Sequence, residues 1–304
     1  VLFRSYYRSS YGGMQSEMAL VRIRKDKMKK LIILLLSLSL FSTNALAEKP
    51  LQKLIVMLDW FPNPDHAPLV VAQQQGFFKQ QGLDVELIGP ADPNDPPKLV
   101  AAGKADIAIT YEPHYMQQVD RGLPLARLGT LIDKPLDCIV ALKESGIKSL
   151  GDLKGKKIGM SVGDMTHSAL RVILEKQGLS LSDVQLVSVK YNLTQALLSH
   201  HVDAVTGMMR NFEVPQLEAK GKKVVVFFPE EYGVPNYSEL IFVIHQARVH
   251  DQRFHHFLAA IKEAVRYIDE HPKETWQQFA KLYPASNNKV NRDAWFATMP
   301  YFAE

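Results

Sequence analysis

The stretch LIVMLDWFPNPDHAPLVVAQQQGFF, residues 54–78, predicts a strand, a turn and a helix in immediate succession. Its first five residues form a continuous apolar run, which is typical of a strand buried on both faces of a parallel sheet. Residues 62–65 (PNPD) exclude regular structure, because proline fixes φ and asparagine and aspartate favour turns. Asp65 is then placed as the N-cap of a helix over residues 67–75. The stretch therefore predicts a βα unit with an unusual polar connection.

That connection carries four side chains with binding chemistry: Asp59, Trp60, Asn63 and His66. Ligands of open α/β sheets bind outside the carboxyl ends of the strands, which is where this turn lies. The carboxylate offers an ionic contact, the indole a stacking face and the imidazole a hydrogen bond. We predict a ligand site here. The alternative is a proline-stiffened loop in which Trp60 only fills the edge of a lobe.

Polar and aromatic side chains recur at the ends of other predicted strands. They are Tyr111, Glu112 and His114; Ser161, Gly163 and Asp164; and Asn211 with Glu213. The free N–H groups of a helix that begins near Gly163 suit an anion or a carbonyl oxygen, although an ordinary N-cap is an equal alternative. The carboxylates give the predicted cleft a negative bias, which favours an amine-bearing ligand over a sulfonate or phosphate. The aromatic residues, with Tyr237 added, suit a flat heteroaromatic ring.

The order of elements predicts two α/β lobes. One βα series runs through residues 54–142, a second through residues 157–228, and a strand over 239–245 returns to the first lobe before a helical end. We predict a two-lobed (type II) periplasmic solute-binding fold, each lobe a mainly parallel sheet flanked by helices, with the ligand cleft between them. The predicted first lobe comprises 48–142 and 238–304, and the second comprises 143–237. An α/β hydrolase is the competing architecture, but the chain has no G-x-S-x-G elbow.

The N-terminal residues predict export to the periplasm. Residues 28–47 combine a lysine pair, an apolar core and an Ala-Leu-Ala ending, the pattern of a cleaved signal peptide. A retained membrane anchor is the alternative, and residues 1–27 are interpreted as a leader that is not native. The C-terminus ends without a helix-stop signal, so we expect further residues beyond it.

Composition excludes several functions. Residues 1–47 hold eight of the 36 basic and two of the 32 acidic residues, so the rest is slightly acidic and has no basic field for nucleic acid. The only cysteine, Cys138, excludes an internal disulfide and a thiolate metal cage. The adjacent histidine pairs at 200–201 and 255–256 lack the i, i+4 spacing of a metal site. We therefore predict neither a metal, another cofactor nor a catalytic residue.

Five segments carry a family resemblance. They are LDWFPNPDHAPLVVAQQQGFFKQQGLDVEL (58–87), KLVAAGKADIAI (98–109), LKGKKIGMSVG (153–163), HVDAVTGMMRNFEVPQLE (201–218) and AVRYIDEHPKETWQQF (264–279). The chain resembles the thiamine-pyrimidine-synthase-like solute-binding family over essentially all of residues 53–304. Some members of that family are binding proteins of ABC importers for pyrimidine precursors such as formylaminopyrimidine or hydroxymethylpyrimidine. Others are fungal-type synthases that use pyridoxal phosphate and one of their own histidines, and a further branch binds riboflavin.

The synthase positions agree only in part. The resemblance puts the Schiff-base lysine at Thr110, the consumed histidine at His114 and a cysteine-rich loop at residues 234–238 (VPNYS). It therefore implies a transport receptor and not an enzyme, with Asp59, Trp60 and Glu213 matching binding-protein motif positions. Its expected partners are a small heteroaromatic ligand and an ABC permease with its ATPase, and a monomer is expected. A riboflavin binder, an alkanesulfonate binder and a pyrimidine-synthase-like enzyme stay open as alternatives.

Overall fold

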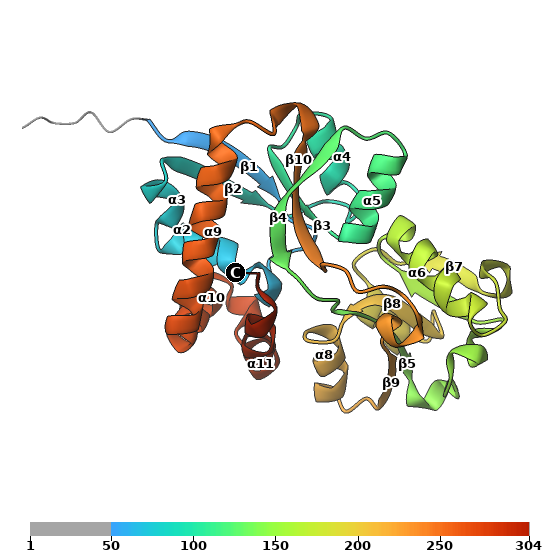
Figure 1. Cartoon of the computed structure of the whole chain (residues 1–304). Coiled ribbons are helices and arrows are strands. Elements are labelled where there is room, and N and C mark those ends of the chain that lie inside the picture. The colour runs from blue at the N-terminus through green and yellow to red at the C-terminus, as the bar shows by residue number, and fades with distance from the viewer. Residues whose placement is uncertain (1–49, 304) are drawn as a thin grey trace, which may run out of the picture. The chain divides into compact units, whose positions relative to one another are not determined.

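The computed structural model of the protein describes residues 50–303, except for the side chains of residues 164–166. The predicted leader (1–27) and signal peptide (28–47) lie outside the described residues. All elements from Leu51 onward belong to one unit, which contains two sheets (Figure 1).

The sheet of the first lobe begins with the quoted stretch. Its strands lie in the order β2 (Leu83–Ile88), β1 (Gln52–Met57), β3 (Ile107–Thr110), β10 (Leu240–His245) and β4 (Leu125–Ile132). β1 is parallel to β2 and β3, whereas β10 is antiparallel to β3 and β4. β3 is fully buried and β1 is apolar from Leu54 onward, because helices cover the sheet, whereas the edge strand β2 alternates between buried and exposed residues.

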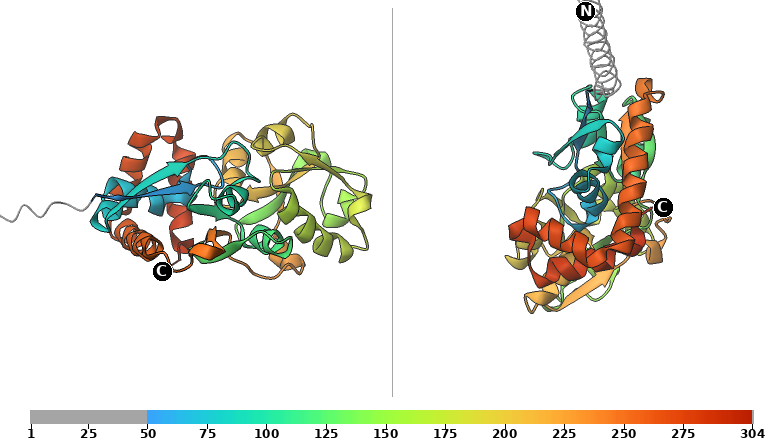
Figure 2. Two further views of the ribbon diagram at one scale, coloured as in Figure 1. Left: turned by 90° about the horizontal axis from the view of Figure 1, so that it is seen from above. Right: turned by 90° about the vertical axis from the view of Figure 1, so that its left-hand side faces the viewer.

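Helices surround this sheet. They are α2 (Ala67–Gln74), α3 (Phe77–Gln80), α4 (Pro96–Ala101), α5 (Glu112–Asp120), α9 (Gln252–Glu270), α10 (Pro272–Leu282) and α11 (Lys289–Thr298). The predicted apolar stripe of α9 is buried in the core, where the Phe257 ring stacks on Phe78 at 5.5 Å and meets Phe242 edge-on at 5.2 Å. Figure 2 shows the C-terminal helices, orange to red, packed against the blue and cyan elements of the first lobe.

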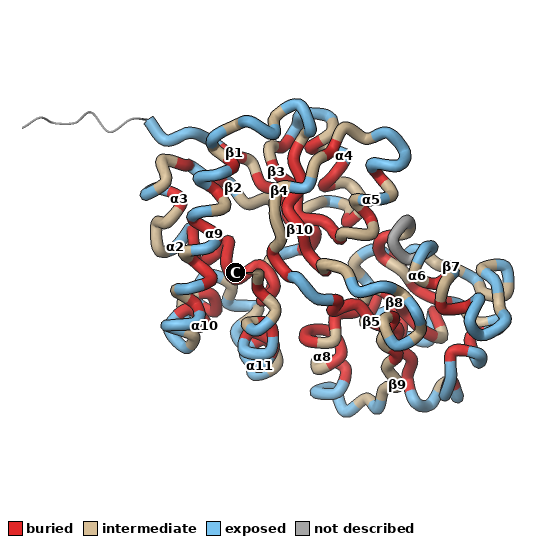
Figure 3. Tube along the Cα trace, viewed as in Figure 1, coloured by how far each residue is buried: buried red, intermediate tan, exposed pale blue. Residues whose placement is uncertain are grey.

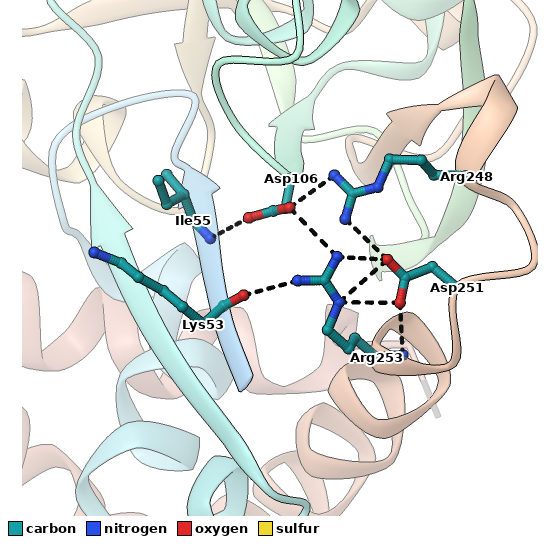
Figure 4. A network of polar contacts seen from close by, with 6 residues as sticks. All are labelled: Lys53, Ile55, Asp106, Arg248, Asp251 and Arg253. Atoms are coloured by element: carbon teal, nitrogen blue, oxygen red, sulfur yellow. Dashed lines mark hydrogen bonds and ion pairs between the residues drawn. The ribbon is translucent and has the colours of Figure 1, made fainter. Parts of the chain in front are cut away.

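A charged network fixes α9 to the amino ends of β1 and β3 (Figure 4). Asp106 accepts from the backbone N–H of Ile55 at 2.7 Å and from Arg248 at 2.7 Å. Asp251, the N-cap of α9, accepts from Arg248 at 2.9 Å and from Arg253 at 2.6 Å, and these contacts lower its carboxyl pKa. Arg253 also donates to the carbonyl of Lys53 at 3.0 Å. This end of the lobe is therefore rigidly connected.

The second lobe has a sheet of its own. Its strands lie in the order β7 (Gln185–Ser188), β6 (Lys157–Met160), β8 (Ala204–Met209), β5 (Asp137–Leu142) and β9 (Val224–Phe227). The helices α6 (Gly163–Glu175), α7 (Leu193–Leu198) and α8 (Glu213–Ala219) belong to it. Cys138 is fully buried on β5, where its thiol donates to the carbonyl of Met208 at 3.0 Å. Figure 3 shows how burial concentrates in the two sheets.

Short 3₁₀ helices connect these elements: η1 (Pro64–His66), η2 (Lys143–Ser145), η3 (Leu150–Leu153), η4 (Leu181–Asp183), η5 (Pro229–Tyr232), η6 (Gln246–Arg248), η7 (Pro284–Ser286) and η8 (Met299–Tyr301).

One detail differs from the sequence prediction. β5 pairs with β8 and β9, so residues 137–142 belong to the second sheet and not, as expected, to the first lobe. Each sheet is mainly parallel, as predicted, and the strand that enters it from the other lobe, β10 in the first sheet and β5 in the second, runs antiparallel to the other four. The chain thus crosses between the lobes before β5 and again before β10.

Glu239 joins these two crossings. Its fully buried carboxyl accepts from the backbone N–H groups of Leu136 at 2.5 Å and Asp137 at 2.9 Å. Arg210 donates to the carbonyl of Asp137 at 3.1 Å and forms a two-pronged ion pair with Glu230 at 2.6 and 3.0 Å. Burial, reinforced by the charge of Asp137, raises the pKa of Glu239 to about 8. Burial likewise raises the pKa of Asp137 to about 7.

These shifts predict that the free energy of unfolding falls as the pH rises from about 5 to about 8. Because both pKa values are higher in the folded chain, the folded state binds more protons, and stability is lost as they dissociate. Each such proton contributes a slope of up to about 1.4 kcal/mol per pH unit. Glu239→Gln should flatten this slope, and Glu231→Gln, at an exposed position, should not. Equal slopes for both variants in denaturant titrations across this range would refute the assignment.

Candidate ligand-binding site

Asp59 organises the polar turn that follows β1. Its carboxylate is buried, with one oxygen 2.8 Å from Nε2 of His66 and the other accepting from the Tyr111 hydroxyl at 2.9 Å. The backbone N–H of Asn63 donates to Nδ1 of His66 at 3.3 Å, so Nε2 carries the proton that His66 donates to Asp59. Both oxygens of Asp59 are therefore engaged in positioning neighbouring side chains.

The helix that follows has a different cap from the predicted one. The Asn63 side chain accepts from the backbone N–H of Asp65 at 2.8 Å and caps η1, which runs directly into α2. The prediction of Asp65 as N-cap is wrong, because helical geometry already begins at Pro64, whose fixed φ suits a first helical position. The Asp65 carboxylate is thereby free to point elsewhere.

Asp65 contacts both the second lobe and the C-terminal helix. The amide nitrogen of Asn211 donates to Asp65 Oδ1 at 2.7 Å and to the hydroxyl of Thr298 at 2.6 Å. The Thr298 hydroxyl lies 3.2 Å from the same Asp65 oxygen. All three side chains are buried, and burial raises the pKa of Asp65 to about 6. Three distant parts of the chain thus meet at one carboxyl group.

Trp60 crosses from the first lobe into the second. It is only 8% exposed and belongs to an apolar cluster that otherwise consists of second-lobe residues such as Leu193, Val214 and Leu217. Tyr191 meets its ring edge-on at 4.5 Å. The indole N–H is buried and has no hydrogen-bond partner among the described residues, so it is available to a ligand acceptor.

The loop after β2 closes the rim between the lobes. The Tyr191 hydroxyl donates to the carbonyl of Pro90 at 2.7 Å, and Lys190 pairs with Asp92 at 3.0 Å. The Asn94 amide donates to the carbonyl of Ser161 at 3.2 Å, while its oxygen accepts from the N–H of Gly163 at 3.3 Å. These contacts define a closed arrangement of the lobes.

Between the lobes lies a small cavity of about 20 Å³ that is partly open to solvent. Its lining consists of Asp59, Trp60, Asn63, Asp65, Tyr111, Ser161, Val162, Gly207, Met209, Phe212 and Glu213. No lysine, arginine or histidine occurs among the described residues that line it. Glu213, at the start of α8, accepts from the backbone N–H of Met209 at 2.8 Å, and burial raises its pKa to about 8. The cavity is therefore acidic and walled by aromatic rings.

Six predicted residues line this cavity: Asp59, Trp60, Asn63, Tyr111, Ser161 and Glu213. Four others lie outside its lining. His66 lies behind Asp59, Asn211 contacts Asp65, Gly163 contacts Asn94, and His114 contacts Thr110 at 3.2 Å and Gln118 at 2.9 Å. The side chain of Asp164 falls outside the described residues.

Glu112 and Tyr237 lie elsewhere than predicted. Both line a second, mainly apolar pocket between α5 and α6, together with Asp137 and Met116. The Glu112 carboxylate pairs with Arg127 and accepts from the backbone N–H of Ser238 at 2.7 Å, which turns it away from the cavity. Because Glu112 follows β3, the sequence correctly placed it at the edge of the sheet. It did not predict the direction in which the Glu112 side chain points.

Sequence reasoning missed Thr298 and most of the apolar wall. Met209 and Phe212 flank the predicted Asn211, and their order MRNFE could have indicated a wall near Glu213. No local signal marks Thr298, which is 233 residues from Asp65. Among the described residues there is no group of three potential metal ligands, and no helix has the length and apolarity to cross a membrane.

The fold and the interlobe cavity define a periplasmic-binding-protein architecture, as predicted. A solved protein of Bordetella bronchiseptica has 25% identity and a TM-score of 0.70, with 84% of each chain covered. The periplasmic aliphatic sulphonate-binding protein of Escherichia coli has 16% identity and a TM-score of 0.65, with 83% of this chain and 85% of that chain covered. At that identity the second likeness concerns the fold alone.

Residues 63–275 match the model of the NMT1/THI5-like family, and the chain belongs to that family. A Haemophilus influenzae protein provisionally assigned to thiamine biosynthesis is 49% identical over 253 residues, covering 83% of this chain and 81% of the relative. The formylaminopyrimidine-binding protein of Halalkalibacterium halodurans is 31% identical over 255 residues, covering 83% and 77%. The predicted family is thus confirmed.

The comparisons also correct one prediction. The Aspergillus parasiticus 4-amino-5-hydroxymethyl-2-methylpyrimidine phosphate synthase is 27% identical over 263 residues, covering 83% of this chain and 77% of the synthase. Relatives named as synthases thus align over the same 83% of this chain as the binding protein does. The prediction, made from the family resemblance, that the chain is not an enzyme is therefore wrong.

The residues present do not fit a Schiff-base cofactor at the position that the resemblance indicates. Such a cofactor needs a lysine amine there, and Thr110 offers only a hydroxyl, which contacts His114. The described lining of the cavity also contains no lysine.

The burial of Trp60 predicts a large effect of its removal. Trp60→Ala should lower the free energy of unfolding by about 3–5 kcal/mol, because it leaves a hole in the second-lobe cluster. Phe61→Ala, which removes a neighbouring ring that is 49% exposed, should cost about 1 kcal/mol or less. Denaturant unfolding measures both. Similar small losses would show that Trp60 is not an anchor between the lobes.

Proposed function

We propose that this protein is the periplasmic substrate-binding component of an ABC importer for a thiamine pyrimidine precursor of the formylaminopyrimidine or hydroxymethylpyrimidine type. The observation that carries the proposal is the buried carboxyl of Glu213, in a cavity walled by Trp60, Tyr111 and Phe212. Aromatic walls suit a flat heteroaromatic ring. A carboxyl group at its edge suits the adjacent ring nitrogen and amino group of an aminopyrimidine.

The protonation of Glu213 supports a basic ligand. Its pKa of about 8 means that the carboxyl is largely neutral at pH 7 in the empty protein. A basic ring nitrogen can take this proton, which leaves a carboxylate that accepts from the ring N–H and from the amino group. The proton moves from Glu213 to the ligand, so this step releases none to solvent. The N–H of Met209 already occupies one acceptor position, but a carboxylate has about four.

The same cavity disfavours the alkanesulfonate alternative. A sulfonate is a permanent anion and needs cationic or several N–H donors. The described lining residues include Asp59, Asp65 and Glu213 and no basic side chain, so an anion would meet the wrong charge. Riboflavin has no fixed charge, so the charge of the cavity does not disfavour it. It is therefore included as a separate ligand in the binding test.

Glu213→Gln should weaken aminopyrimidine binding about ten- to hundredfold, because the amide has no proton to transfer and forms no charge-assisted bond. Affinity in the parent should fall above about pH 8, where Glu213 has already lost its proton. Calorimetry with hydroxymethylpyrimidine, formylaminopyrimidine, riboflavin and an aliphatic sulfonate measures this.

Glu218→Gln, at an exposed position of the same helix, is the control and should bind like the parent. If Glu213→Gln binds the aminopyrimidines as tightly as Glu218→Gln does, Glu213 serves only the start of α8. Tighter binding of the sulfonate than of the pyrimidines would refute the ligand assignment.

The importer role requires export. The pattern of residues 28–47 predicts cleavage after Ala47, so the periplasmic protein should begin at Glu48. N-terminal sequencing of protein recovered from the periplasm tests this. An N-terminus at Met28, or recovery from the cytoplasm alone, would contradict the proposed location and with it the delivery to a permease.

A further inference from the structure

Thr298, at the end of α11, has an unusual set of partners for a buried threonine. Its side chain is fully buried and contacts the first lobe through Asp65 and the second through Asn211. The hydroxyl also lies 2.8 Å from the carbonyl of Ala294, one turn earlier in the same helix. One hydroxyl group thus touches α11 and both walls of the cleft.

The hydrogens of this cluster can be assigned. Asn211 uses both N–H bonds of its amide, one toward Asp65 at 2.7 Å and one toward the Thr298 oxygen at 2.6 Å. The single hydroxyl proton of Thr298 has two candidate acceptors, the carbonyl of Ala294 and the carboxyl of Asp65. It can serve only one of them at a time. When Asp65 is ionised, the charge makes its carboxylate the stronger acceptor.

α11 also packs against the segments that carry the cavity's acidic residues. It contacts η1, which holds Asp65, and α8, which begins with Glu213. The amide of Gln216 on α8 reaches Asn291 on α11 at 3.5 Å. The C-terminal helix therefore lies against both lobes.

We propose that Thr298 is a positioning residue of the ligand cleft. Its hydroxyl group holds Asp65 and Asn211 together, and through it α11 connects the two closed lobes. Asp65 lines the cavity, whereas Thr298 does not, so Thr298 would act on a ligand through Asp65. Four other ionisable groups interact electrostatically with Asp65. The charges of Asp59 and His66 act on the Asp65 carboxyl. The charge of Asp65 acts in turn on Glu213 and Glu239.

Thr275 provides a matched control. It is likewise fully buried and lies in the preceding helix, α10. Its hydroxyl contacts only backbone carbonyls of its own turn, His271 at 2.9 Å and Pro272 at 3.2 Å. Replacing it by valine removes comparable local bonds without touching the contact between the lobes.

The test compares Thr298→Val, Thr298→Ser and Thr275→Val in the full protein. The ligand arm rests on the proposed function and uses hydroxymethylpyrimidine as the probe. Thr298→Val should weaken binding about tenfold, mainly through faster dissociation, because Asn211 and Asp65 lose a shared partner. Thr298→Ser should restore parental affinity, and Thr275→Val should retain it while its Tm falls.

Two readouts separate positioning from simple stability. The hydrogen bond from Thr298 lowers the pKa of Asp65, so Thr298→Val should move the acidic limb of the pH profile of binding to higher pH. Small-angle X-ray scattering without ligand should show Thr298→Val more open than the parent and Thr275→Val.

If the parent binds no pyrimidine, the proposed function fails, and the ligand-free scattering still decides the role of Thr298. The positioning role is overturned if Thr298→Val lowers Tm but gives the same scattering as Thr275→Val. Where binding is measurable, the two variants would then also have the same affinity and the same pH profile of binding.

Discussion

Where the two lobes meet, the protein removes Asp65, Asp137, Glu213 and Glu239 from water. A desolvated carboxylate is costly, so these groups hold their protons more tightly than they would in the unfolded chain. Closing the lobes therefore has an electrostatic cost that depends on proton supply. In the proposed complex, a basic ring nitrogen that takes the Glu213 proton would offset part of this cost, because the buried carboxylate then faces a cation.

The other constraints follow from this junction. The paired oxygens of Asp59 fix Tyr111 and His66, which leaves Glu213 as the carboxyl with capacity for a ligand. Trp60 inserts into the apolar cluster of the opposite lobe, so the lobes share hydrophobic surface as well as polar contacts. Glu239 holds the two crossings together at the hinge. The charged network connects α9 to the amino ends of β1 and β3 within the first lobe.

The sequence was most informative where chemistry is local. Apolar runs identified β1 and α2, and family motifs identified Trp60 and Glu213 as cavity residues, but the expected irregular turn over 62–65 already contains the start of η1 at Pro64. It failed where direction or pairing depends on distant parts. Glu112 follows a strand as expected, but Arg127 and Ser238 turn it away. The strand over 138–142 follows the first series in sequence, yet it pairs with β8 and β9. Nothing near Thr298 indicates that it meets Asp65.

The burial of Cys138 has a practical consequence. Its thiol donates to the Met208 carbonyl, and burial raises its pKa well above the ordinary value, so the reactive thiolate hardly forms. It is the only cysteine of the chain. A new cysteine at the exposed ring position of Phe61 would therefore be the single site that reacts with a maleimide dye. Such a conjugate would carry its label at the rim of the cleft, and a change in its fluorescence would report binding of the proposed ligand without a change to the interior.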